Sequence, residues 1–248
     1  MKPELQPSAP TSRLQQSIAT ALARAVAQSL QAHAPARDGG SASCCGVSTA
    51  PLPCSLWRTP RGSSASAAAL HLAASQAPDQ ATRTRFAMLY ARCLVHYREQ
   101  LRASEPEDDA GAALACFLAA CLQGLQGHAV TPERWQALAT WVNDFVDAQA
   151  AWQAAPAAEQ QDFFERMAIL AAAVGEWSVQ ASRQGAAAIA AARAMATQHL
   201  KAQLGLDAAD WVHAMRHLQI VAGHAANPSW GDAELPTVPA FGVQDHRL

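Results

Sequence analysis

From Pro78 to Gly223 the chain is an almost unbroken succession of alanine-rich segments with apolar residues at helical spacing. Apolar side chains that recur every three or four residues share one face of an α-helix, and that face must be buried. No glycine-rich phosphate loop, serine nucleophile elbow or paired-cysteine zinc spacing interrupts these segments. The sequence therefore predicts an all-α fold, an antiparallel bundle of about six helices over residues 78–223.

Local signals at the ends of these segments locate the individual helices. Ser104, followed by Pro106 and Glu107, matches an N-cap with a proline in the first turn, so a helix is expected from residue 105. The acidic residues that follow would lie in its first turn, where the helix dipole favours them. Gly205 is expected as the C′ residue of a later helix. The six helices are expected to begin near residues 79, 105, 131, just after 156, 185 and 208, the last ending near 222.

Two of these helices carry clear apolar stripes. The first places Tyr90, Leu94 and Tyr97 on one side and shows its arginines, Arg98 among them, largely on other faces. The segment after Pro156 alternates spacings of four and three, which is typical of helices that pack in a bundle. Its stripe consists of Phe163, Met167, Leu170, Val174 and Trp177.

Residues 1–77 differ from the rest in composition, and we expect them to form a flexible N-terminal arm. Within the arm, five apolar residues recur every four positions and predict an amphipathic helix over 13–33. The stripe either docks on the main body or binds a partner or a membrane surface, and its residues are Leu14, Ile18, Leu22, Val26 and Leu30. Residues 35–77, rich in Gly, Ser, Ala and Pro, are expected to be a disordered linker, although Trp57 within it favours local packing on the body. Residues 224–248 are expected to be an irregular tail.

Charge and hydropathy exclude several classes of partner. Residues 1–78 carry six basic and two acidic residues, while the remainder carries twelve and eighteen, so a basic arm precedes an acidic body. An acidic body does not favour binding to nucleic acid, which needs clustered Lys and Arg. No apolar run reaches the roughly 18 residues of a transmembrane segment. The start lacks the pattern of a signal peptide, so a cytoplasmic location, or dedicated export, is expected.

The best candidate for a metal site is a polar cluster on the last helix. Asp210, His213 and His217 lie at positions i, i+3 and i+7 and so share one face, with His199 on the preceding helix. Two histidines on one helix face can chelate a divalent ion. Histidines near a helix C-terminus are also favoured by the helix dipole, and Asp–His pairs at this spacing are common on surfaces. No cofactor is expected.

Two tryptophans fall outside the predicted inward stripes. Trp141 and Trp152 lie off the apolar face of the helix that is expected to run to about residue 154. Tryptophan is enriched in the central contacts of protein interfaces, so both are candidate partner-binding residues. The alternative is that they anchor the core of the protein.

The stretch from Tyr90 to Trp211 resembles a domain-of-unknown-function family of all-helical bacterial proteins. The resemblance rests on the acidic run Glu107-Asp108-Asp109 with the segment 113–118 after it, on Glu165-Arg166-Met167, and on the segment 200–207. The family implies no known activity, and it assigns no catalytic residue to this chain.

The sequence therefore favours a non-enzymatic helical protein–protein interaction module of a bacterium. Such a module is expected to expose an apolar patch, and its partner is expected to be another protein. One alternative is a protein exported by a dedicated secretion system, with residues 1–77 as the export arm. Another is a helical protein that binds a metal or a small ligand. The sequence leaves the oligomeric state open.

Overall fold

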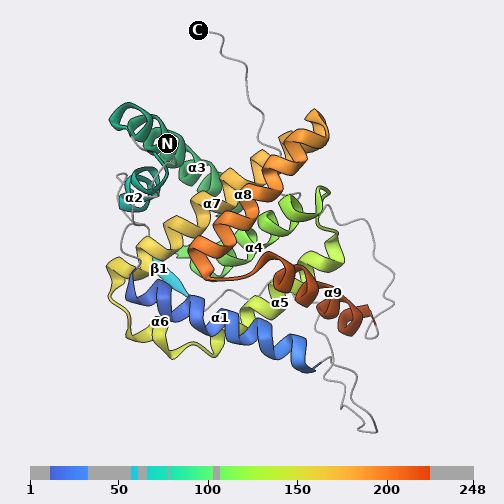
Figure 1. Ribbon diagram of the computed structural model, residues 1–248. Coiled ribbons are helices and arrows are strands. Elements are labelled where there is room, and N and C mark those ends of the chain that lie inside the picture. Colours follow the sequence, from blue (N-terminus) through green and yellow to red (C-terminus); the bar gives the residue numbers. More distant parts are fainter. Residues whose placement is uncertain (1–11, 33–56, 61–65, 78, 103–106, 224–248) are drawn as a thin grey trace, which may run out of the picture.

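The computed structural model describes residues 12–32, 57–60, 66–77, 79–102 and 107–223, and this part of the chain is almost entirely helical (Figure 1). The predicted all-α class is confirmed, with more helices in the described residues than the six expected. The helices are α1 (Arg13–Ala32), α2 (Ala67–Gln76), α3 (Gln80–Arg102), α4 (Ala110–Gln126), α5 (Pro132–Asp147), α6 (Ala150–Ala154), α7 (Ala157–Gln184), α8 (Ala186–Leu204) and α9 (Ala208–Gly223). Two short strands, β1 (Arg58–Pro60) and β2 (Glu107–Asp109), pair antiparallel.

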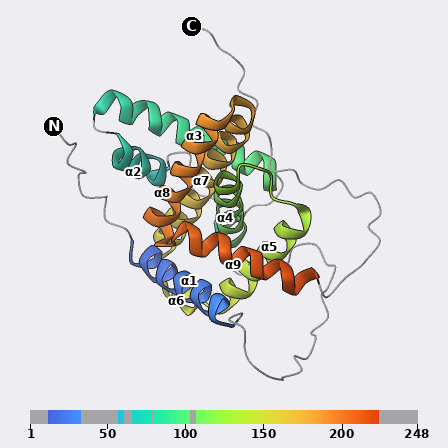
Figure 2. The same ribbon diagram turned by 45° about the vertical axis from the view of Figure 1, so that its right-hand side comes forward.

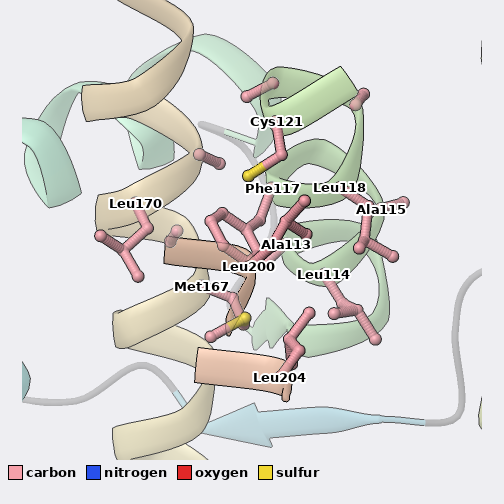
Figure 3. Close-up of a cluster of buried hydrophobic side chains, with 14 of the residues drawn as sticks. Ala113, Leu114, Ala115, Phe117, Leu118, Cys121, Met167, Leu170, Leu200 and Leu204 are labelled. Carbon is pink, nitrogen blue, oxygen red and sulfur yellow. The ribbon is translucent and has the colours of Figure 1, made fainter. Parts of the chain in front are cut away.

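Helix α4 is the centre of the core. Its sequence is apolar around nearly the whole circumference, so it is stable only when other helices surround it. The surrounding helices include α7 and α8, and Figure 3 shows Phe117 of α4 together with Met167 of α7 and Leu200 of α8. All three side chains are fully buried. The apolar sequence of this segment thus corresponds to a central and largely buried helix.

Small residues allow α4, α7 and α8 to approach closely. A Cβ atom at Gly124 of α4 would lie 2.9 Å from the Oγ of Ser178 on α7. It would also lie 3.1 Å from the Cβ of Ala196 on α8, which is closer than carbon atoms normally pack. The alanine-rich sequence of α8 therefore serves close helix packing, as its small side chains predict.

The predicted helix start at residue 105 is wrong, because residues 107–109 form strand β2. Asp109 pairs with Arg58 in the register of the two strands, and α4 begins one residue later. Asp109 is the N-cap, and its Oδ1 accepts a hydrogen bond from the amide of Ala112 at 2.9 Å. A local capping pattern therefore gives way to pairing with a distant strand. The other predicted ends at Thr131 and Gly205 are confirmed.

The structure differs from the predicted boundary between an arm at 1–77 and a bundle at 78–223. Helix α1 packs against α8 and α9, with further contacts to α6 and α7. The amide of Leu14 donates to the Oε2 of Glu159 at 3.0 Å, and the Gln15 side chain donates to the carbonyl of Gln203 at 3.0 Å. Strand β1 and helix α2 also pack against the body. The rest of the predicted arm and the tail at 224–248 lie outside the described residues.

Candidate functional site

The described side chains among the residues predicted to bind a metal do not form a closed site. Asp210 and His213 of α9 are exposed, while the side chain of His217 lies outside the described part of the chain. His199 of α8 is buried, with 8% of its surface exposed. Among the described residues, no three His, Cys, Asp or Glu side chains lie close enough together to hold a metal ion. The structure therefore gives Asp210 and His213 no further described ligand.

The predicted partner-binding residues are mostly in the core. The first four residues of the α1 stripe are at most 3% exposed, and Leu30 is partly buried against the core. The stripe therefore docks on the body, which is the alternative that the sequence left open. Trp152 is 1% exposed, and Trp141 is partly buried beside Trp211, with ring centroids 5.9 Å apart. These side chains anchor the core in this structure.

An aromatic cluster attaches the segment around β1 to the helical body. Trp57, which precedes β1, is 1% exposed and stacks on Trp152 with ring centroids 4.7 Å apart. Trp57 also makes edge-on ring contacts with Phe145 of α5 and Phe163 of α7. Its carbonyl accepts a hydrogen bond from the amide of Ala110 at 2.9 Å, which ties it to the start of α4. Residue 57 is thus part of the core.

The densest polar cluster among the described residues lies between α3, β2 and α7. Arg98 of α3 forms two hydrogen bonds to Asp108 of β2, from Nε at 3.2 Å and from NH2 at 2.6 Å. The same NH2 lies 3.7 Å from the Oε1 of Glu165 on α7. The Arg98 guanidinium also sits over the Phe164 ring, 5.5 Å from its centroid. Both carboxylates are buried, so the Arg98 guanidinium faces two buried acids.

Neutral side chains complete this network. Gln161 donates to the Oε1 of Glu165 at 2.9 Å and accepts from the hydroxyl of Thr59 in β1 at 3.0 Å. Ser66, the N-cap of α2, donates its hydroxyl to the Oε2 of Glu165 at 2.6 Å. The same Ser66 oxygen accepts from the amide of Ala69. The network thus connects α2, α3, β1, β2 and α7. Because its polar groups satisfy one another, its geometry supports a structural role.

No local sequence pattern predicted this network. Arg98 was expected largely outside the buried face of its helix, and Asp108 was expected in the first turn of the next. The partners are far apart along the chain, with 99 positions between Ser66 and Glu165 and 102 between Thr59 and Gln161. Residue spacing within one helix does not reveal such contacts.

The thiols of Cys93 in α3 and Cys121 in α4 have low reactivity. Burial, with a further effect of the Glu176 carboxylate, raises the pKa of Cys93 to about 11. Burial also raises the pKa of Cys121 well above its usual value. Because the thiolate is the reactive form, both groups are protonated and weakly nucleophilic at neutral pH.

Buried His199 should make the stability of the protein depend on pH. Burial lowers its pKa from 6.5 to about 4, so between these values the unfolded chain binds a proton that the folded chain does not. Stability should therefore fall as pH decreases from about 6.5 to about 4, by up to about 1.4 kcal/mol per pH unit from this group. Urea unfolding of wild type and H199L at several pH values measures the effect. H128Q, at an exposed histidine, should keep the slope; an unchanged slope in H199L would contradict the assignment.

Large apolar side chains remain exposed at one group of helices. Every exposed large hydrophobic residue in the described ranges belongs to α2, α3 or α7, and these three helices pack against one another. Figures 1 and 2 show α2 and α3 together at one end of the molecule. The residues are Leu70 (61% exposed), Met88 (65%), Leu89 (49%), Val95 (54%) and Trp177 (50%).

Helix α3 combines this apolar character with positive charge. Met88 and Val95 are seven residues apart and therefore share one face of the helix. Arg85 and Arg92 are exposed on the same side, because they lie three residues before Met88 and three before Val95. The opposite side of α3, with Tyr90 and its neighbours in the stripe, is buried. We call Arg85, Met88, Arg92 and Val95 the α3 outer face.

The described residues form a small all-α protein with a buried polar network in its core and an exposed apolar and basic face on α3. The chain belongs to the family described as "Family of unknown function (DUF6683)", whose model matches residues 12–212. The match confirms the resemblance noted over residues 90–211, and it extends through α1, β1 and α2. No curated protein and no solved structure matches the sequence. In the part of the chain that the structure describes, every helix is too short or too polar to cross a membrane.

Proposed function

We propose that this protein is a non-enzymatic protein–protein interaction module that binds its partner through the α3 outer face. The observation that carries the proposal is the restriction of exposed large apolar side chains to α2, α3 and α7. Clustered exposed apolar groups on a folded protein are typical of a binding surface. The proposal therefore concerns a surface, whereas the aromatic and polar clusters described above maintain the fold.

The fold does not require apolar residues at the exposed positions of α3. The inward side of the helix already has Tyr90 at 5% and Leu94 at 4% exposed. Tyr90 also donates a hydrogen bond from its hydroxyl to Gln76 of α2. Met88 and Val95 gain little from folding because most of their surface stays in water, so a partner that covers them would supply the missing burial.

Affinity purification of the tagged full-length protein from its own host tests the proposal. M88S/V95S should lose the specific partner that wild type retains, because two apolar contacts at the centre of the surface are removed. The matched control, A191S/A194S, makes two exposed positions of α8 polar and should retain the partner. Circular dichroism and thermal unfolding should be the same for all three proteins. Retention of the same partner by M88S/V95S would contradict the proposal.

Two other functions, export with residues 1–77 as the export arm and binding of a metal or small ligand, have weaker support. The α1 stripe and Trp57 are buried in the core, so their use as a detached arm would break many contacts. Asp210 and His213 have no further ligand among the described residues. The α3 outer face needs neither rearrangement nor an additional group.

A further inference from the structure

The charges of α3 indicate which kind of partner its outer face can bind. The helix sequence contains five arginines and one acidic residue, whereas the whole chain has a net charge of -2. Arg85 and Arg92 flank Met88 on the outer face, and neither forms an ion pair with a carboxylate of the described residues. Arg98, by contrast, is used in the buried network. Two cations thus border the apolar strip without a partner in the described fold.

We infer that the α3 outer face binds an acidic amphipathic helix of another protein. The inference rests on the proposed function and adds the chemistry of the partner. Met88 and Val95 lie two turns apart on one face of α3. This is a spacing at which two packed helices contact each other through apolar side chains. Carboxylates on the borders of that second helix would meet Arg85 and Arg92, and arginine forms strong, often bidentate hydrogen bonds with carboxylates.

A second copy of this chain fits the same face poorly. If two α3 helices packed antiparallel with Met88 of each copy on Val95 of the other, the two Arg92 side chains would meet near the twofold axis. A parallel pair would place the equivalent arginines of the two copies at the same height on opposite borders of the interface, with no carboxylate of the outer face to meet them. Like charges placed together in an interface disfavour that partner. Charge complementarity therefore favours a separate, acidic chain over self-association.

Selection from a displayed peptide library tests this inference. The library holds amphipathic helices of about five turns with a fixed leucine and alanine seam, and the border positions vary among Glu, Lys, Gln and Ser. The full-length protein is the bait. We expect the selected helices to carry Glu well in excess of Lys at the border positions. Synthetic peptides from the selection should bind at least tenfold more weakly to R85E/R92E, and more weakly at high salt. Lys-for-Glu versions of these peptides should bind R85E/R92E better than wild type.

The outcomes separate this inference from the proposed function. If M88S/V95S loses the peptides but R85E/R92E binds them as wild type does, or if Lys is enriched, the acidic partner is excluded and the binding face stands. If M88S/V95S binds the selected peptides unchanged, or if no helix is enriched, both fail. If wild type sediments as a dimer and M88S/V95S as a monomer, the face binds a second copy of this chain. Binding to vesicles with anionic phosphatidylglycerol, lost in R85E/R92E, would point to a membrane surface; either result would overturn the acidic helix.

Discussion

Replacement of Arg98 by alanine should lower the free energy of unfolding by about 3–5 kcal/mol, because it removes the guanidinium that faces two buried acids. The Asp108 side chain is 2% exposed and the Glu165 side chain 6% exposed, so bulk water does not solvate these carboxylates in the folded protein. The variant also loses the contact of Arg98 with the Phe164 ring. Urea unfolding followed by circular dichroism measures the change.

The control for this prediction is another arginine of the same helix. Arg92 is exposed on α3, so R92A should change stability by less than about 0.5 kcal/mol. The double variant R98M/D108L removes both charges of the closest pair, and it should be more stable than R98A because Asp108 no longer carries a buried charge. If R98A and R92A unfold at the same urea concentration, the network does not stabilise the fold as described.

Replacement of Trp57 by alanine should also cost about 3–5 kcal/mol, which is typical for the loss of a fully buried tryptophan. The side chain is enclosed by Trp152, Phe145 and Phe163, and its removal would leave a cavity between α5, α6 and α7. The result decides whether residues before 78 belong to the cooperative fold. If residues 1–77 were a flexible arm, W57A would not change the free energy of unfolding.

An exposed tryptophan provides the matched comparison. Trp177 of α7 is 50% exposed, so W177A should cost far less than W57A, although it removes the same side chain. Thermal unfolding of W57A, W177A and wild type under one set of conditions gives the comparison. Equal melting temperatures for W57A and wild type would show that the segment around β1 does not pack on the body in solution.

Helix ends show how far local sequence determined the structure. Thr131 is the N-cap of α5, and Gly205 has the left-handed conformation with φ of 65° at the end of α8. Both signals act within one turn of helix, so the sequence was sufficient. At residue 105 a similar signal failed, because β1, which pairs with residues 107–109, lies almost fifty positions earlier.

The two ends of the α7 stripe show why exposure was harder to predict. Phe163 is 1% exposed, as expected, but Trp177 of the same stripe is 50% exposed. Residue spacing shows which side chains share a helix face, but it does not show how far a neighbouring helix covers that face. For the same reason the exposed apolar residues of α3 were not identified as a surface. They became a candidate binding site only when the packing of α2, α3 and α7 was known.

The sequence by itself determined the all-α class, the order and approximate extent of most helices, and the amphipathic nature of α1. These properties depend on the spacing of apolar residues and on caps, which act over a few positions. Only the tertiary structure decided that α1, β1 and α2 belong to the core, that Arg98 neutralises buried acids, and that the outer face of α3 stays exposed. These properties depend on which distant segments meet, as in the hydrogen bond between Leu14 and Glu159 across 145 positions. Such contacts arise from the joint packing of all the helices, which no local pattern encodes.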